Sequence, residues 1–317
     1  MSLLARQIRS GVTETSHHGS VAVVDRDGKL VARHGDIDRV FFLRSAAKPF
    51  QALVSQESGA GLDPMELAMA CASHRGFPVH VALVESMLAR AGLDETALQC
   101  PPDWPLSPVA AREMHRAGAG SRRRIWHNCS GKHAGFLRAC VANGWPIESY
   151  LDPDHPLQRE IVARVGELGS FPVGPIGVDG CGAPVLRTTA RAMATLFGRL
   201  ATDDDCAQVF GEMHRYPGLI GANGEGDTEI AIVTNSAAKG GAAGCVGVAV
   251  HDRLGIGVKS WEGLGSIGNL AAAAALHQLG VLVPTGVDSL GPILRPPVLG
   301  GDRVVGHIEA VFHLETI

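Results

Sequence analysis

The chain has 317 residues, enough for about two domains or for one large domain divided into lobes. Hydrophobic residues make up 45% and charged residues 19%, which excludes a disordered chain, and the net charge of −4 provides no basic field for nucleic acid. There is no apolar run long enough to span a bilayer and no signal-peptide pattern, and 7 cysteines are too few for a disulfide scaffold. We therefore expect a soluble, cytoplasmic protein that binds neither nucleic acid nor a membrane.

Strand-forming residues dominate both ends of the chain. Residues 20–24 and 29–33 flank the turn sequence Asp25–Gly28, which predicts a β-hairpin, and a short strand follows at residues 40–43. Near the other end, strands are expected at residues 229–234, 245–251, 255–259 and 304–314, with a helix at 269–279.

The centre of the chain is expected to be mainly helical, because apolar residues recur there at helical spacing between Pro or Asp starts and Gly ends. The predicted helices cover residues 64–72, 79–91, 108–117, 132–143, 156–167, 188–201 and 206–215. The fold class is therefore α/β (α+β). Residues 1–50 and 225–317 form a lobe that contains the sheet, and residues 51–224 form a helical lobe inserted between them.

Two glycine-containing motifs are misleading. The segment Gly263–Gly268 matches G-x-G-x-x-G, but too few residues follow it to complete a dinucleotide-binding fold, so we interpret it as a glycine-rich turn. The segment Ser130-Gly131-Lys132 lacks the first glycine and the final Ser or Thr of a phosphate-binding loop.

The first candidate catalytic motif is S-x-x-K, formed by Ser45 and Lys48 where a strand gives way to a helix. Positions i and i+3 share a helix face, so the amine can reach the hydroxyl and act as its base. Lowering the lysine pKa to about 7.5 requires roughly 4 kcal/mol, which burial and a second cation can supply. The alternative is that Ser45 simply caps the helix.

A second candidate pair combines Ser73, in Ser73-His74 at the end of a predicted helix, with Lys239, which precedes the strand at 245–251. If Lys48 and Lys239 converge, each cation lowers the pKa of the other and favours the neutral amine. The chain has only five lysines among its 28 basic residues, so each lysine deserves inspection.

Cys129 and Cys181 lie in glycine-flanked segments and provide two soft thiolate ligands for zinc. From general ligand preferences the third ligand is His127 or His133, because lysine rarely binds zinc. The alternative is that the two cysteines are buried thiols packed together.

Taken together, these segments resemble the rhizobial-type (class 3) L-asparaginases of the asparaginase II family. The resemblance spans about residues 19–311. The segments that carry it are Leu43–Pro49, Cys71–His74, Asn128–His133, Asp152–Pro156 and Asp179–Cys181, in family order, and Asn128–His133 is the most specific of them.

The resemblance implies a fold like that of serine β-lactamases and glutaminases, a homodimer, and a Zn²⁺ site. As the third zinc ligand the resemblance implies a lysine in place of His127 or His133, so the implied ligands are Cys129, Lys132 and Cys181. The implied catalytic residues are Ser45, Lys48, Ser73 and Lys239. The implied substrate-binding residues are Arg44 for a carboxylate, Asp179 for an ammonium group, and His74.

Two segments depart from the family pattern. Residues 75–80 lack the acidic residue expected ahead of His80, and residues 221–227 also differ from the family's usual sequence. These departures bear on the substrate range, because the serines and the metal ligands are all present.

The resulting hypothesis is hydrolysis of the side-chain amide of L-asparagine through a serine acyl-enzyme. Either serine is a candidate nucleophile, and Ser45 is favoured because it lies at a helix start. The alternatives are a glutaminase, a penicillin-recognising serine acyltransferase, or a zinc-stabilised protein that binds a small amino acid without turnover. The absence of S-D-N after S-x-x-K argues against β-lactam chemistry.

Overall fold

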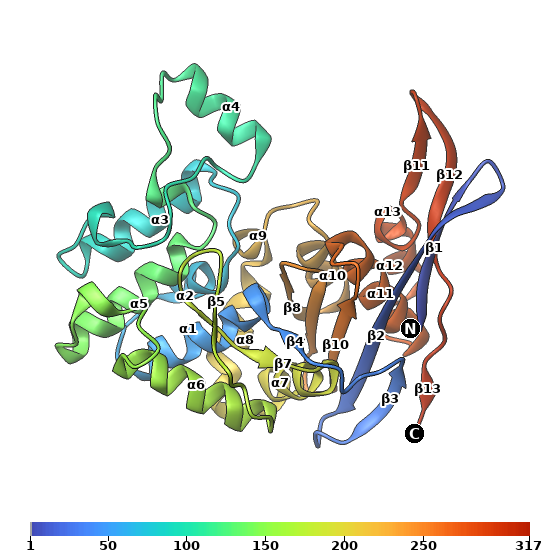
Figure 1. Ribbon diagram of the computed structural model, residues 1–317, viewed down its shortest axis with the longest axis horizontal. Coiled ribbons are helices and arrows are strands. Elements are labelled where there is room, and N and C mark those ends of the chain that lie inside the picture. Colours follow the sequence, from blue (N-terminus) through green and yellow to red (C-terminus); the bar gives the residue numbers. More distant parts are fainter. Residues whose placement is uncertain (1) are drawn as a thin grey trace.

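Both ends of the chain contribute strands to one antiparallel sheet. A computed structural model describes residues 2–317, and within them nine strands form this sheet, in the order β11-β12-β1-β2-β10-β9-β8, with β3 beside β2 and β13 beside β3 (Figure 1). Its strands are β1 (Leu3–Arg9), β2 (Val12–Asp25), β3 (Leu30–His34), β8 (Ser236–Gly241), β9 (Cys245–Val250), β10 (Leu254–Ser260), β11 (Pro297–Gly300), β12 (Arg303–Ala310) and β13 (Glu315–Thr316). The predicted sheet from both chain ends is confirmed.

The centre of the chain is helical, as predicted. Its helices are α1 (Lys48–Glu57), α2 (Pro64–Cys71), α3 (Pro78–Ala89), α4 (Pro108–Arg116), α5 (Ser130–Asn143), α6 (Pro156–Gly169), α7 (Ala190–Thr202), α8 (Ala207–Arg215) and α9 (Pro217–Ile220). Short strands lie before and between them, with β4 (Phe41–Phe42) paired to β7 (Arg187–Thr188) and β5 (Gly177–Val178) paired to β6 (Pro184–Val185).

One predicted strand is wrong. Residues 229–234 belong to helix α10 (Gly226–Thr234), which ends at Asn235 in the left-handed conformation and leads into β8. Asp227 and Glu229 lie in the first helical turn, where the helix dipole favours acidic side chains. The β-branched residues at 230–234 suggested a strand, but these acidic residues and Asn235 delimit a short helix. The helices that follow are α11 (Gly265–Gln278), α12 (Pro284–Ser289) and α13 (Gly291–Leu294).

Helices cover both faces of the sheet. Alternate residues of β2 point to opposite sides, so Val21 and Val23 pack with α10 and α11, whereas Ala22 and Val24 pack with the helices of the centre. The sheet curls around α11, which contacts strands from β8 to β12 (Figure 1). On the opposite face α7 lies directly on β10. A Cβ at Gly257 would come within 2.2 Å of the Ala190 carbonyl oxygen, so this position requires glycine.

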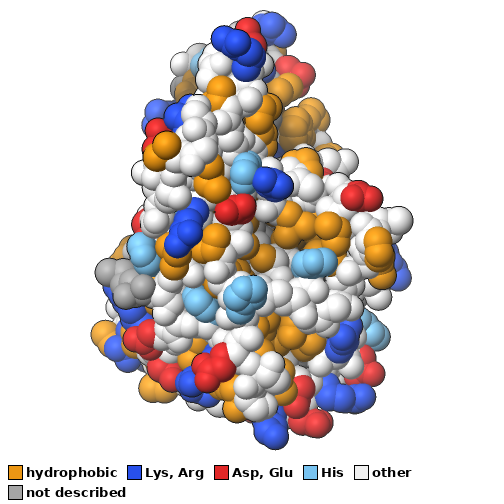
Figure 2. All heavy atoms as spheres, turned by 90° about the vertical axis from the view of Figure 1, so that its right-hand side faces the viewer, with side chains coloured by type: hydrophobic (Ala, Val, Ile, Leu, Met, Phe, Trp, Pro, Cys, Tyr) orange, Lys and Arg blue, Asp and Glu red, His pale blue; other side chains and the backbone are white. Residues whose placement is uncertain are grey.

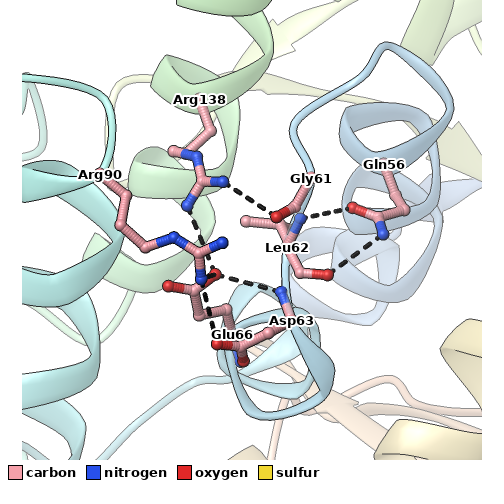
Figure 3. A network of polar contacts seen from close by, with 7 residues as sticks. All are labelled: Gln56, Gly61, Leu62, Asp63, Glu66, Arg90 and Arg138. Atoms are coloured by element: carbon pink, nitrogen blue, oxygen red, sulfur yellow. Dashed lines mark hydrogen bonds and ion pairs between the residues drawn. The ribbon is translucent and has the colours of Figure 1, made fainter.

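A buried carboxylate joins three of the central helices. Glu66, in the first turn of α2, accepts hydrogen bonds from Arg90 at 3.0 Å and from Arg138 at 3.3 Å (Figure 3). Arg90 follows α3 and Arg138 belongs to α5. Because Glu66 is completely buried, the two guanidinium groups offset its loss of hydration. The contact fixes α2, which Ser73 follows by two residues, against α5, whose start carries two of the three predicted zinc ligands, Cys129 and Lys132.

The face to the right of Figure 1 mixes apolar, histidine and charged side chains without a large patch of one charge (Figure 2). None of the helices within residues 2–317 combines the length and the apolar character that crossing a membrane requires.

Two buried histidines shape the segment between α2 and α3. His74 and His80 have ring centroids 5.4 Å apart, and both are at most 2% exposed. Each ring accepts a backbone N–H through Nδ1, from Gly76 at 3.1 Å and from Phe77 at 3.2 Å. Burial lowers the pKa of His80 from 6.5 to about 4, and burial also lowers the pKa of His74 well below its ordinary value.

The pKa of His80 predicts a pH dependence of stability. In the unfolded chain the His80 imidazole becomes protonated below about pH 6.5, whereas in the folded protein it stays neutral down to about pH 4. Between these values the unfolded state binds more protons, so the free energy of unfolding falls as the pH is lowered. The contribution of His80 is at most about 3 kcal/mol. Urea unfolding at pH 7 and pH 4.5 measures the loss, and His80→Gln should show a smaller loss than the wild type. Equal losses in the two proteins would contradict the assignment.

Candidate active site

The amine of Lys48 lies at the centre of the candidate site. Lys48 begins α1 and is 1% exposed, and its Nζ donates to the carbonyl oxygens of Ala72 at 2.6 Å and Asn128 at 3.3 Å and to Ser73 Oγ at 3.0 Å. Burial lowers the pKa of Lys48, and Lys239 and Lys132 lower it further, against an opposing effect of Cys129 and Cys181. The amine therefore joins three distant segments, and its environment favours the neutral form more than water does.

This contact corrects the predicted pairing of serines and lysines. Sequence spacing paired Ser45 with Lys48, and likeness to known enzyme motifs paired Ser73 with Lys239, but in the structure Lys48 contacts Ser73. Ser45 lies in the 3-10 turn at 44–47, which leads directly into α1, and Arg44 ahead of it has a φ of 50°. Positions three residues apart eclipse in a 3-10 turn, so spacing still places Ser45 and Lys48 on one face. The hydrogen bonds of the Lys48 amine nevertheless go to Ser73 and to the carbonyl oxygens of Ala72 and Asn128.

Lys239 has a different partner, which the sequence analysis missed. Lys239 lies on β8, is 1% exposed, and its Nζ is 3.5 Å from Asp227 Oδ2 in α10. Asp227 also accepts the backbone N–H groups of Gly240 at 2.7 Å and Thr228 at 3.0 Å. Burial acts to raise the pKa of Asp227, but Lys239 and these N–H groups outweigh it, so the net shift is downward. Lys239 is therefore ion-paired. Because residues 229–234 were expected to be a strand, Asp227 gave no signal as a partner.

The predicted zinc ligands come together. Lys132 Nζ lies 3.1 Å from Cys181 Sγ, and all three of Cys129, Lys132 and Cys181 are at most 5% exposed. A hydrogen bond with Cys181 lowers the pKa of Cys129 well below its ordinary value despite burial, and Lys48 and Lys132 add to the effect. Burial acts to lower the pKa of Lys132, but Cys181 and Cys129 raise it overall.

This donor set is compatible with zinc. Two thiols and one amine supply soft and nitrogen donors, and the low pKa of Cys129 favours the thiolate that binds the metal. Within residues 2–317 no three His, Cys, Asp or Glu side chains form such a cluster, so a third protein ligand would be Lys132. His127 accepts the Cys129 N–H through Nδ1, and His133 contacts Tyr150 OH at 2.7 Å through Nδ1.

The three predicted substrate-binding residues do not line the cavity at Ser45 and Ser73. Arg44 Nε and Asp179 Oδ1 are 2.7 Å apart, so the two side chains neutralise each other. His74 is completely buried, with Nε2 2.8 Å from Ser130 Oγ and Nδ1 occupied by Gly76 N–H. Its ring therefore supports the backbone next to Ser73. The family resemblance assigned these three residues to substrate binding near the metal ligands, and that assignment stays a prediction.

The cavity contains an ion pair that the sequence analysis also missed. It has a volume of about 540 Å³, and Ser45, Ser73 and Lys239 contribute to its wall. Arg75 and Glu225 line the same cavity and form an ion pair with each other. They lie in the two segments that depart from the family pattern, which was the available signal. Gly265 and Ser266, the first two residues of α11, form another part of the cavity wall.

A family profile described as L-asparaginase II matches residues 5–310 of the chain. No match is found among curated protein sequences.

Among solved structures the chain is similar to a protein named Mglu in its native form, with 18% identity, a TM-score of 0.38, and coverage of 90% of this chain and 70% of that one. It is also similar to a probable glutaminase named ybaS, with 16% identity, a TM-score of 0.41, and coverage of 83% and 85%. A third similar structure is a Bacillus glutaminase in the presence of 4.3 M NaCl, with 12% identity, a TM-score of 0.38, and coverage of 84% and 92%.

The family match covers nearly the whole chain and includes all of the segments that meet around Lys48. The chain therefore belongs to the L-asparaginase II family, a membership that supports amidohydrolase activity.

Proposed function

We propose that the protein hydrolyses the side-chain amide of L-asparagine to L-aspartate and ammonia. Membership of the L-asparaginase II family supports the reaction class. The observation that carries the proposal is the 3.0 Å contact between Ser73 Oγ and the buried Nζ of Lys48, next to a cavity that admits a small molecule. A serine within hydrogen-bond reach of a desolvated amine is an arrangement that activates a nucleophile.

The contacts of Lys48 define its role. The carbonyl oxygens of Ala72 and Asn128 only accept hydrogen bonds, so they take the two N–H groups of a neutral amine. The lone pair of that amine then faces Ser73 Oγ and can accept its proton. This assignment makes Ser73 the nucleophile. Ser45, which the sequence favoured, shares the cavity and is left to contact the substrate.

The reaction proceeds in two halves. Ser73 Oγ attacks the amide carbon while its proton passes to Lys48, and the tetrahedral intermediate then breaks the carbon–nitrogen bond as the proton moves from Lys48 to the departing nitrogen. Ammonia leaves and an ester remains on Ser73. Water next attacks the ester, gives a proton to Lys48, and releases aspartate as that proton returns to Ser73. Lys239, ion-paired with Asp227, provides positive charge at the same cavity.

Cys129, Lys132 and Cys181 are proposed to hold one Zn²⁺. When bound, a zinc ion with two thiolate ligands supplies modest positive charge and rigidity rather than strong Lewis acidity. Asn128, whose carbonyl oxygen contacts Lys48, directly precedes Cys129, so the ligands would fix this contact.

Substitution of the central pair tests the mechanism. Ser73→Ala and Lys48→Met should each reduce kcat for asparagine by at least about a hundredfold, because general-base and nucleophilic catalysis are both lost. The matched control is Lys29→Met, which changes an exposed lysine and should leave kcat unaltered. Ammonia release from asparagine, with glutamine in parallel, is the measurement. Loss of activity in Ser45→Ala with normal turnover in Ser73→Ala would reverse the roles of the two serines.

Metal analysis tests the zinc site. Elemental mass spectrometry of the purified protein should find about one zinc per chain, and Cys181→Ser should remove most of it because a thiolate ligand is lost. The control is Cys206→Ala, which removes another buried cysteine whose pKa burial raises to about 12 and which should keep the metal. Zinc-free wild-type protein, or full zinc content in Cys181→Ser, would contradict the assignment.

A further inference from the structure

Four charged side chains line the cavity, and they form two ion pairs of different kinds. Asp227 and Lys239 are at most 9% exposed, and Asp227 is already bonded to two backbone N–H groups. Arg75 and Glu225 are more open, with side-chain exposures of 23% and 38%. The first pair is enclosed and satisfied, whereas the second has atoms free to meet a ligand.

Arg75 has donors to spare. Its Nη2 contacts Glu225 Oε2, but its buried Nε has no hydrogen-bond partner within the described residues. A guanidinium carries five N–H donors and matches a carboxylate in a two-point contact. The exposed part of the Arg75 side chain therefore lies at the cavity with N–H groups beyond the one that meets Glu225.

The arrangement of the two charges matches one class of ligand. A free α-amino acid carries a carboxylate and an ammonium group on the same carbon, so a site for it needs a cation and an anion side by side. Arg75 and Glu225 are such a pair, and together they add no net charge to the cavity. A ligand with two negative charges would be repelled by Glu225, and a ligand with two positive charges would be repelled by Arg75.

The position of the pair agrees with this ligand. Arg75 lies two residues beyond Ser73, and Glu225 lies two residues before Asp227, the partner of Lys239. An amino acid held by its α-carbon groups at this pair would extend its side chain into the cavity shared with Ser73. By contrast, Arg44 and Asp179, which also form an ion pair, do not line this cavity.

We propose that Arg75 and Glu225 form the binding site for the α-carboxylate and α-ammonium groups of the substrate, so that the enzyme requires a free amino acid with an amide side chain. This inference rests on the proposed function. It selects against asparagine within a peptide, because a peptide bond removes one or both charges. It also makes the two segments that depart from the family pattern the determinants of substrate range.

Binding of L-aspartate, which is not consumed, tests the pair independently of turnover. Calorimetry should show binding to the wild type and affinity about tenfold to a hundredfold weaker in Arg75→Gln and Glu225→Gln, because each loses a charged hydrogen bond. The matched control is Arg164→Gln, which breaks an Arg–Glu ion pair of similar exposure, 19% and 39%, outside the cavity wall. Its affinity should equal that of the wild type.

An exchange of the two charges separates binding from a structural role. The double variant R75E/E225R keeps an ion pair, so its melting temperature should recover relative to the single variants. Its affinity for aspartate should stay weak because the charges face the wrong groups of the ligand. Recovery of both properties, or unchanged affinity in the single variants, would overturn the proposal.

Blocked substrates assign the two charges. Wild-type enzyme should discriminate by about tenfold or more against asparaginamide and N-acetylasparagine relative to asparagine. Arg75→Gln should lose most of the discrimination against asparaginamide only, and Glu225→Gln against N-acetylasparagine only. Full discrimination in both variants would refute the proposal. If the wild type binds aspartate through this pair but releases no ammonia from asparagine, the proposed reaction fails and the binding site stands.

Discussion

The burial of the Lys48 amine is the constraint on which the site depends. An amine removed from water must find hydrogen-bond partners or destabilise the fold. Lys48 finds them in the carbonyl oxygens of Ala72 and Asn128 and in Ser73. Ala72 and Ser73 directly follow α2, and Asn128 lies just before α5. The buried Glu66 holds these two helices together through its contacts with Arg90 and Arg138. The requirement to satisfy one amine therefore determines where the end of α2 meets the start of α5, and this junction carries the proposed nucleophile and two of the three predicted metal ligands, Cys129 and Lys132.

The same reasoning extends to the other lysines. Four of the five are at most 6% exposed, and only Lys29 lies at the surface. The partners of the four buried amines are carbonyl groups and a hydroxyl for Lys48, carbonyl groups alone for Lys259, a thiol for Lys132, and a carboxylate for Lys239. Because the partners differ, the amines differ in chemistry. A lysine with neutral partners near other cations is suited to accept a proton, whereas one beside a carboxylate is suited to provide fixed charge.

The sequence predicted the parts of the fold and site that depend on local pattern. The hairpin at Asp25–Gly28 and the helices of the centre follow from turn residues and helical spacing. The grouping of Cys129 with Cys181 was predicted from two cysteines in glycine-flanked segments, and the choice of Lys132 as their neighbour came from family resemblance. The choice of partners was not predictable, because it depends on backbone geometry at a few junctions. Ser45 and Lys48 lie three residues apart, yet the Lys48 amine contacts Ser73, and α10 in place of a strand presents Asp227 to Lys239. Each of these partners comes from another segment of the chain, so no local spacing relates it to its lysine.

The two departures from the family pattern can be explained as one feature. Considered separately, an arginine at 75 and a glutamate at 225 are changes in unrelated loops, about 150 residues apart in sequence. In the structure they are in contact on the wall of one cavity. A partly buried guanidinium without a carboxylate would carry an uncompensated charge, and so would the carboxylate alone. Each residue therefore makes the other acceptable, which couples the two loops. The coupling places a cation and an anion on the cavity wall that Ser73 also lines, and neither charge contacts Lys48, so the proposed recognition pair and the proposed nucleophile and base are separate sets of residues around one cavity.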